Sequence, residues 1–150
     1  MKQEATLVIA GGLLVLLSYL VFLPRALSKR SLDELWFGID GSLRYAYWVS
    51  IALTTCFAVA LFFDLSAGDF APPPLFLVSL VVFFLGSATW APSLAAGELS
   101  AWTSVSLALA AMGALGVCTT FSSDGWRWPT VAQLGCLLLV WQTLFMDFGI

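Results

Sequence analysis

The chain has 150 residues, enough for a single domain spanning 1–150. Only 10% of these residues are charged and 61% are hydrophobic, whereas a soluble domain carries about 25% charged residues. This fraction of charged residues is too small to cover a water-facing surface. We therefore expect lipid to surround most of the chain. A net charge of −3 with only six Lys and Arg argues against nucleic acid as a partner.

The residue types that carry most enzyme chemistry are scarce. The chain has no His, which removes the commonest general base, metal ligand and haem ligand. Cys56, Cys118 and Cys136 lie far apart in apolar runs, a spacing typical of buried thiols rather than of a metal site. There is no glycine-rich phosphate loop and no pair of membrane-embedded carboxylates. We therefore predict no catalytic residue and no metal site, and expect that the protein is not an enzyme.

Five charge-free runs predict transmembrane helices. A helix needs about 20 residues to cross the hydrocarbon of a bilayer, and its backbone amides must be satisfied within the segment. The predicted helices are about 5–23, 45–63, 74–90, 102–121 and 129–147. Pro24 and Pro92 are expected to end the first and third helices, whereas Pro74 and Pro129 begin the third and fifth, where proline costs little. The predicted fold is an all-α membrane bundle of five transmembrane helices.

The loop between the first two helices carries a helix signal of its own. Ser31 and Glu34 form a capping box. Apolar residues follow at helical spacing, among them Leu35, Trp36 and Ile39. This pattern predicts a short amphipathic helix over 31–43 that lies in the membrane interface. It serves either as a surface connector or as a docking site for a partner, with Leu35, Trp36 and Ile39 as the docking residues.

The same loop predicts the orientation of the chain. It holds the cations Arg25, Lys29, Arg30 and Arg44, against Lys2 and Arg127 on the other side. Because short loops rich in Lys and Arg stay in the cytoplasm, we expect this loop on the cytoplasmic-equivalent side and the N-terminus opposite.

Two helices differ in how they are expected to pack. In 102–121, Ser106, Ala110 and Ala114 form a row of small residues spaced by four, and Gly116 lies on the neighbouring row. Small residues let membrane helices approach closely, so this helix is expected at the centre. The helix 74–90 is bulky all round, which favours a position facing lipid or a partner.

Polar groups inside the predicted spans are few. Gln133 and Gln142 lie in the fifth helix with Trp141, and either they join helices or they bind a ligand on which Trp141 stacks. Asp64 is expected in a solvated loop. No carboxylate, Lys or Arg falls at a predicted midplane, which argues against ion-coupled transport.

Seven tryptophans are present, and most of them, including Trp90, fall near predicted helix ends, as in an aromatic belt. The segment Trp90-Ala91-Pro92 at the end of the third helix, together with Trp141 in the fifth, resembles the tryptophan-rich sensory or translocator family. Members of that family have five helices and bind tetrapyrroles and sterols. Their Trp- and Pro-rich block between the first two helices is replaced here by the charged loop around Leu35-Trp36-Phe37.

Three functions remain open. The first is a non-catalytic accessory subunit of a larger membrane complex, such as an organellar respiratory or photosynthetic assembly, with membrane lipids and other membrane subunits as partners. The second is a binder of a flat apolar ligand, for which a lipid, carotenoid, sterol or tetrapyrrole would serve. The third is a small channel or transporter. The missing chemistry and the minimal loops favour the first.

Overall fold

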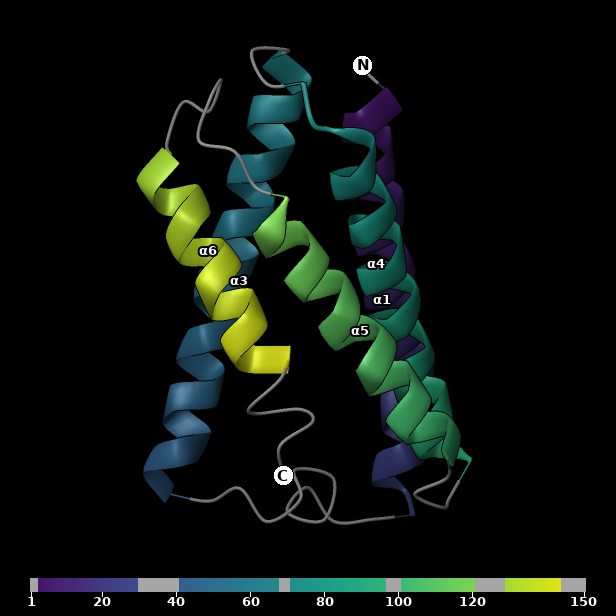
Figure 1. Cartoon of the computed structure of the whole chain (residues 1–150). Coiled ribbons are helices and arrows are strands. Elements are labelled where there is room, and N and C mark those ends of the chain that lie inside the picture. The colour runs from purple at the N-terminus through teal and green to yellow at the C-terminus, as the bar shows by residue number, and fades with distance from the viewer. Residues whose placement is uncertain (1–2, 30–40, 68–70, 97–100, 121–128, 144–150) are drawn as a thin grey trace.

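A computed structural model of the whole chain describes residues 3–29, 41–67, 71–96, 101–120 and 129–143. Every regular element within these ranges is a helix: α1 (Gln3–Leu27), α3 (Gly41–Ala67), α4 (Pro74–Ala95), α5 (Ala101–Thr119) and α6 (Pro129–Trp141). Consecutive helices run in alternating directions (Figure 1). The prediction of an all-helical bundle is confirmed. Most of the predicted interfacial helix, including Leu35, Trp36 and Ile39, lies outside the described residues, and its last residues, 41–43, belong to α3.

Four of the described helices are long and apolar enough to cross a membrane, which is the architecture of an integral membrane protein. The apolar spans are Gln3–Leu27, Trp48–Ala67, Pro74–Ala95 and Ala101–Thr119. The shortest has 19 residues, which at about 1.5 Å per residue approaches the thickness of the hydrocarbon. The described part of α6 has 13 residues, so the fifth span stays a prediction.

The two prolines that were expected to end helices do not. Helix α1 continues through Pro24 to Leu27, and α4 continues through Pro92 to Ala95. A proline removes one backbone hydrogen bond, and membrane helices tolerate it where neighbouring groups satisfy the freed carbonyl. The prediction for the start of α4 is confirmed, because Pro73 is extended and the helix begins at Pro74.

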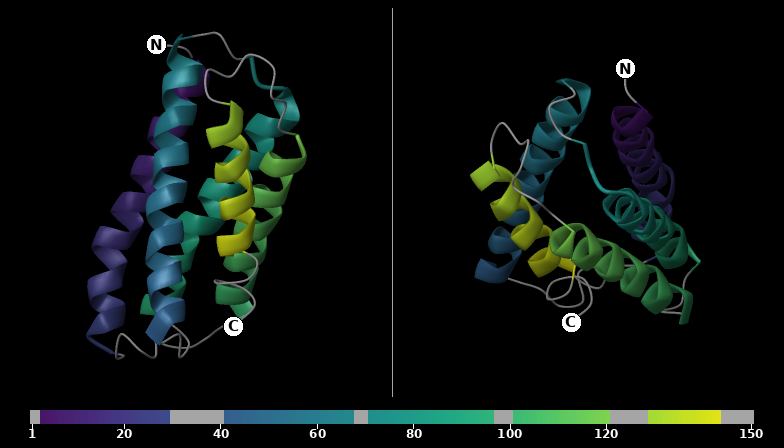
Figure 2. Two further views of the ribbon diagram at one scale, coloured as in Figure 1. Left: turned by 90° about the vertical axis from the view of Figure 1, so that its left-hand side faces the viewer. Right: turned by 45° about the horizontal axis from the view of Figure 1, so that its top comes forward.

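The helices form two layers. Helix α4 packs extensively between α5 and α1, and α3 pairs with α6 to form the second layer (Figure 2). The layers meet where α5 contacts α6 and where α1 contacts α3. The expectation that the bulky helix 74–90 lies at the periphery is therefore wrong. That helix has an interior position because its glycine, serine and alanine residues give it a narrow face.

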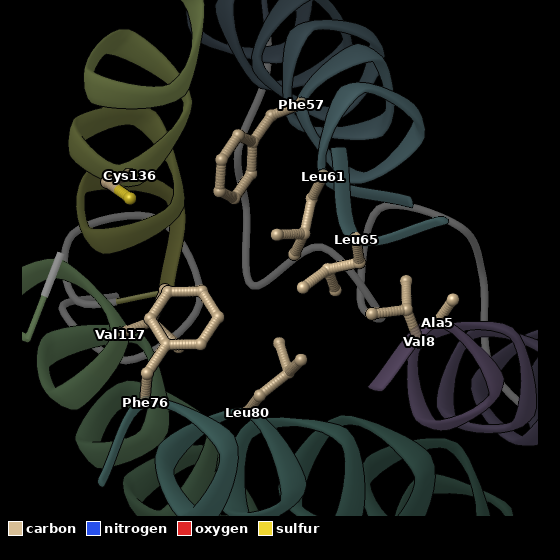
Figure 3. Packing of buried hydrophobic residues seen from close by; sticks show 9 residues of the cluster. All are labelled: Ala5, Val8, Phe57, Leu61, Leu65, Phe76, Leu80, Val117 and Cys136. Carbon is tan, nitrogen blue, oxygen red and sulfur yellow. The ribbon is translucent and has the colours of Figure 1, made fainter. Parts of the chain in front are cut away.

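The main core lies between the two layers and receives side chains from all five described helices (Figure 3). Phe57, Leu61 and Leu65 project from α3 toward Phe76 and Leu80 of α4. The cluster is completed by Ala5, Val8, Val117 and Cys136. A second cluster at the other end of α4 contains Ala26, Trp90, Ala91, Leu94 and Leu107.

Large apolar side chains also point away from the bundle. On α1 they are Leu13, Leu14, Leu16, Leu17, Leu20 and Val21, all exposed. A helix that places its bulkiest apolar side chains outward and its small ones inward is suited to lipid, since lipid tails solvate leucine as well as a protein core does.

Candidate functional site

Glycines bring the backbones of α4 and α5 into contact. A Cβ at Gly86 of α4 would lie 2.7 Å from the carbonyl oxygen of Ser106 and 2.9 Å from Cα of Ala110. A Cβ at Gly113 of α5 would lie 2.6 Å from Cα of Phe83. Neither position has room for a side chain, so the close contact between α4 and α5 depends on both glycines. We call this contact the glycine seam.

The packing residues expected from the sequence lie along the same seam. Ser106, Ala110 and Ala114 are all buried, and Gly116 is half-buried with the Ser79 side chain directly beside it. The hydroxyl of Ser106 donates to the carbonyl of Thr103 at 2.8 Å in its own helix. Sequence reasoning missed the facing residue Gly86, although a lone glycine in a run of Leu, Val and Phe was the available signal.

Polar side chains join α1 to α4. The Ser18 hydroxyl donates to the carbonyl oxygen of Ala88 at 2.5 Å. Near the ends of the same two helices, Nζ of Lys29 donates to the carbonyl oxygen of Ala95 at 2.9 Å. The lysine also places a cation at the C-terminal end of α4, where the helix dipole is negative. Both contacts act as structural joints between helices.

Trp90 is not part of an aromatic belt. Its ring is buried against Tyr19 with 5.6 Å between centroids, and its Nε1 has no hydrogen-bond partner among the described residues. Trp48 and Trp102 lie near helix ends and are 53% and 61% exposed, as a belt residue should be. The difference arises because Trp90 faces α1, whereas the other two face outward.

A second polar joint holds α6 to α3. The Thr54 hydroxyl shares its single hydrogen between two acceptors, the carbonyl oxygen of Ser50 at 2.7 Å and Oε1 of Gln142 at 3.1 Å. Further along α6, Gly135 lies directly against the side chain of Phe57. Gln142 and Trp141 are both half-buried, so the C-terminal part of α6 faces the bundle.

Gln133 lies apart from the other two residues that were expected to bind a ligand. It is exposed, together with Thr130, Leu134 and Leu137 of the same helix. Nine residues separate it from Gln142, which turns the two side chains to opposite sides of a helix with 3.6 residues per turn. The three proposed ligand residues therefore do not converge.

Gln133 lies near the start of the apolar helix α6. The helix begins at Pro129, about one turn before Gln133. Two residues after Gln133, Gly135 packs on Phe57 of α3. Gln133 is thus an outward-facing carboxamide on an apolar helix, and it has no hydrogen-bond partner among the described residues.

The expectation for Asp64 is wrong. It belongs to α3, which continues to Ala67, and its side chain is fully buried. The sequence predicts that the helix ends before Asp64, because the charge-free run stops there. The last turn of a membrane helix can nevertheless carry a carboxylate where the other helices enclose it. Of the cysteines, only Cys136 is fully buried, and Cys56 faces outward.

The described side chains do not suggest a metal centre: no three His, Cys, Asp or Glu in that part of the chain gather closely enough to hold a metal ion. Comparison with known protein families, with curated proteins and with solved structures finds no match to this chain. A functional assignment must therefore come from the chain's own residues.

Proposed function

We propose that the chain is a non-catalytic structural subunit of a larger membrane protein assembly. Five transmembrane helices hold it in the bilayer, with the first loop on the cytoplasmic-equivalent side. The observation that carries this proposal is the exposed carboxamide of Gln133 on the apolar helix α6. It marks the outer face of α6 as a contact for another membrane protein.

The physical argument is the cost of that side chain in lipid. Moving an amide from water to a hydrocarbon that offers no hydrogen bond costs about 4–8 kcal/mol. Lipid tails have no donor or acceptor, whereas a polar group on a neighbouring helix can supply one. A contacting protein chain therefore removes a penalty that the bilayer alone would leave in place.

Other polar side chains support a structural role, because they bond within the bundle. Ser18 and Lys29 join α1 to α4, and Thr54 joins α3 to α6. Ser79 and Ser106 bond carbonyls of their own helices. Gln133 differs from them, because its exposed carboxamide has no hydrogen-bond partner among the described residues.

The test is purification from the native membrane in a mild detergent, followed by native electrophoresis. We expect the wild-type chain to co-migrate with a complex much larger than itself, and Gln133→Leu to be lost from it. The matched control is Gln142→Leu, the same chemical change on the inward side of the same helix, which should remain in the complex. A wild-type chain that migrates alone contradicts the proposal.

A second candidate function is the binding of a flat apolar ligand such as a tetrapyrrole, carotenoid or sterol. It is favoured by Gln142, whose carboxamide bonds Thr54 through its oxygen and leaves its nitrogen for an acceptor on a ligand. Trp141, half-buried and next to it in the chain, offers a ring face. Here the same two variants exchange roles: Gln142→Leu should release the ligand and change the absorbance of the purified protein, whereas Gln133→Leu should not.

A further inference from the structure

Two cations lie side by side at the C-terminal end of α1. Arg25 and Lys29 are both exposed, and a separation of four residues turns them by only about 40° around a helix of 3.6 residues per turn. The Ser28 amide donates to the carbonyl oxygen of Pro24 at 3.0 Å, which carries the helical turn beyond Leu27. The two cations therefore leave α1 on the same side, about one turn apart.

Their depth in the membrane follows from the length of α1. The apolar span Gln3–Leu27 has 25 residues, which at 1.5 Å per residue gives about 37 Å, against about 30 Å of hydrocarbon. The end of α1 therefore reaches the headgroup zone. Arg25 lies about 3 Å along the axis before that end, and a long basic side chain in such a position extends its charge outward. Both charges thus lie at the level of the phospholipid phosphates.

The hydrogen-bond donors of these cations are only partly used within the protein. The guanidinium of Arg25 lies 5.6 Å from the ring centroid of Phe22 and has no hydrogen-bond or ion-pair partner among the described residues. Its five N–H donors form a fork that fits two oxygens of a phosphate. Nζ of Lys29 donates one of its three hydrogens to the carbonyl oxygen of Ala95 at 2.9 Å, which leaves two. Both cations therefore have donors left for an anion.

We propose that Arg25 and Lys29 bind the phosphate of an anionic phospholipid, whose acyl chains lie along α1. Phosphate is the anion that the headgroup zone supplies at every lipid-facing surface, and its hydrogen bonds to guanidinium and ammonium groups are charge-assisted. A carboxylate at this place would have to come from another protein chain. A lipid of net negative charge fits better than a zwitterionic one, because the lipid then has no cation of its own near the phosphate.

The exposed apolar side of α1 supplies the second half of the site. Val21 and Leu14 lie on the same side of the helix as Arg25, one and three turns closer to the bilayer centre, and both are 47% exposed. Acyl chains can cover these side chains while the phosphate stays on the cations. A phosphate dissolved in water would use the cations alone, so the apolar side chains favour a lipid over a soluble anion.

Lipid retention by the purified chain tests the site. The chain is mixed in detergent micelles with phosphatidylglycerol or with phosphatidylcholine of the same acyl chains, and native mass spectrometry counts the lipids that stay bound. We expect the wild-type chain to retain phosphatidylglycerol in preference. Arg25→Gln should lower this retention about fivefold, the effect of one cation near an anionic lipid surface, and leave that of phosphatidylcholine unchanged. Arg25→Lys, which keeps the charge, should retain the preference.

The variant is placed at Arg25 because Lys29 also joins α1 to α4 through Ala95, so a change there would disturb the bundle itself. The matched control is Arg127→Gln, which removes the same charge from the segment between α5 and α6. It should retain phosphatidylglycerol as the wild-type chain does. An equal loss in both variants would indicate an effect of net charge alone and would overturn the proposal.

Three further results would also overturn it. The first is equal retention of the two lipids by the wild-type chain. The second is displacement of phosphatidylglycerol by an excess of inorganic phosphate, which would assign the cations to a soluble anion. The third is an Arg25→Gln chain that keeps its lipid but is lost from a larger complex on native electrophoresis, which would assign the cations to a carboxylate of another protein.

Discussion

Ser18 of α1 donates its hydroxyl hydrogen to the carbonyl oxygen of Ala88 in α4, with 2.5 Å between the oxygens. In a regular helix the N–H of residue 92 would donate to that carbonyl, but residue 92 is a proline, which has no N–H. Ser18 thus replaces the missing intrahelical donor with one from a neighbouring helix. This relationship explains how α4 continues past Pro92 inside a membrane.

We expect Ser18→Ala to lower the free energy of unfolding by about 1–3 kcal/mol, because it leaves a buried carbonyl without a donor. The Ser28→Ala variant is a matched control, since the Ser28 hydroxyl is exposed and bonds the carbonyl of Arg25 in its own segment. Its effect should stay within about 0.5 kcal/mol. Unfolding by sodium dodecyl sulfate in mixed micelles measures both.

A double-mutant cycle tests the cause of that loss. In a Pro92→Ala background the new backbone N–H can donate to the Ala88 carbonyl, so Ser18→Ala should cost less there by more than about 0.5 kcal/mol. The same cost in both backgrounds would show that the hydroxyl stabilises the protein for a reason unrelated to Pro92.

The glycine seam gives a second prediction. Gly86→Ala should destabilise the bundle by about 1–3 kcal/mol, since its Cβ would enter the α5 backbone at Ser106 and Ala110 and the helices would have to separate. Gly12→Ala is the matched control, because a Cβ there meets nothing within 4 Å. It should be neutral or slightly stabilising, as alanine favours helix over glycine by up to about 1 kcal/mol. Thermal unfolding in detergent compares the two.

Much of this fold could be predicted from the sequence because the bilayer imposes one strong rule. Long charge-free runs must be helices, so the number and approximate limits of the helices among the described residues followed from charge and length. The small-residue row at Ser106, Ala110 and Ala114 likewise predicted a buried face, and those residues are buried.

The wrong predictions share a physical cause: contacts with a neighbouring helix outweighed the preference that each residue type has on its own. Pro92 should stop a helix, but Ser18 of α1 satisfies the freed carbonyl. Trp90 should lie at the interface, but Tyr19 of α1 covers it. Asp64 should lie in water, but the bundle encloses it. Which side of α6 Gln133 faces could not be predicted either, since the fifth helix shows polar residues on opposite sides.

The joint between α3 and α6 can be tested through its two side chains. Thr54→Val and Gln142→Leu each remove one partner of the 3.1 Å hydrogen bond. We expect a coupling free energy of about 0.6–2 kcal/mol between the two changes, the range for hydrogen bonds between membrane helices. Thr55→Val is the control, because the Thr55 hydroxyl bonds Ile51 in its own helix. A coupling near zero would mean that the carboxamide of Gln142 is held by something other than Thr54.

Trp90 yields the last prediction. Trp90→Phe keeps a ring against Tyr19 and removes an indole N–H that is buried without an acceptor. Because an unsatisfied buried donor costs about 1–3 kcal/mol, this gain offsets the lost volume, and the net change should be within about 1 kcal/mol. Trp90→Ala should cost about 3–5 kcal/mol, since it empties the site. If Trp90→Phe destabilises the protein nearly as much as Trp90→Ala in the same unfolding assay, the indole N–H has an acceptor in the membrane and the buried ring stabilises the bundle through a hydrogen bond as well as through packing.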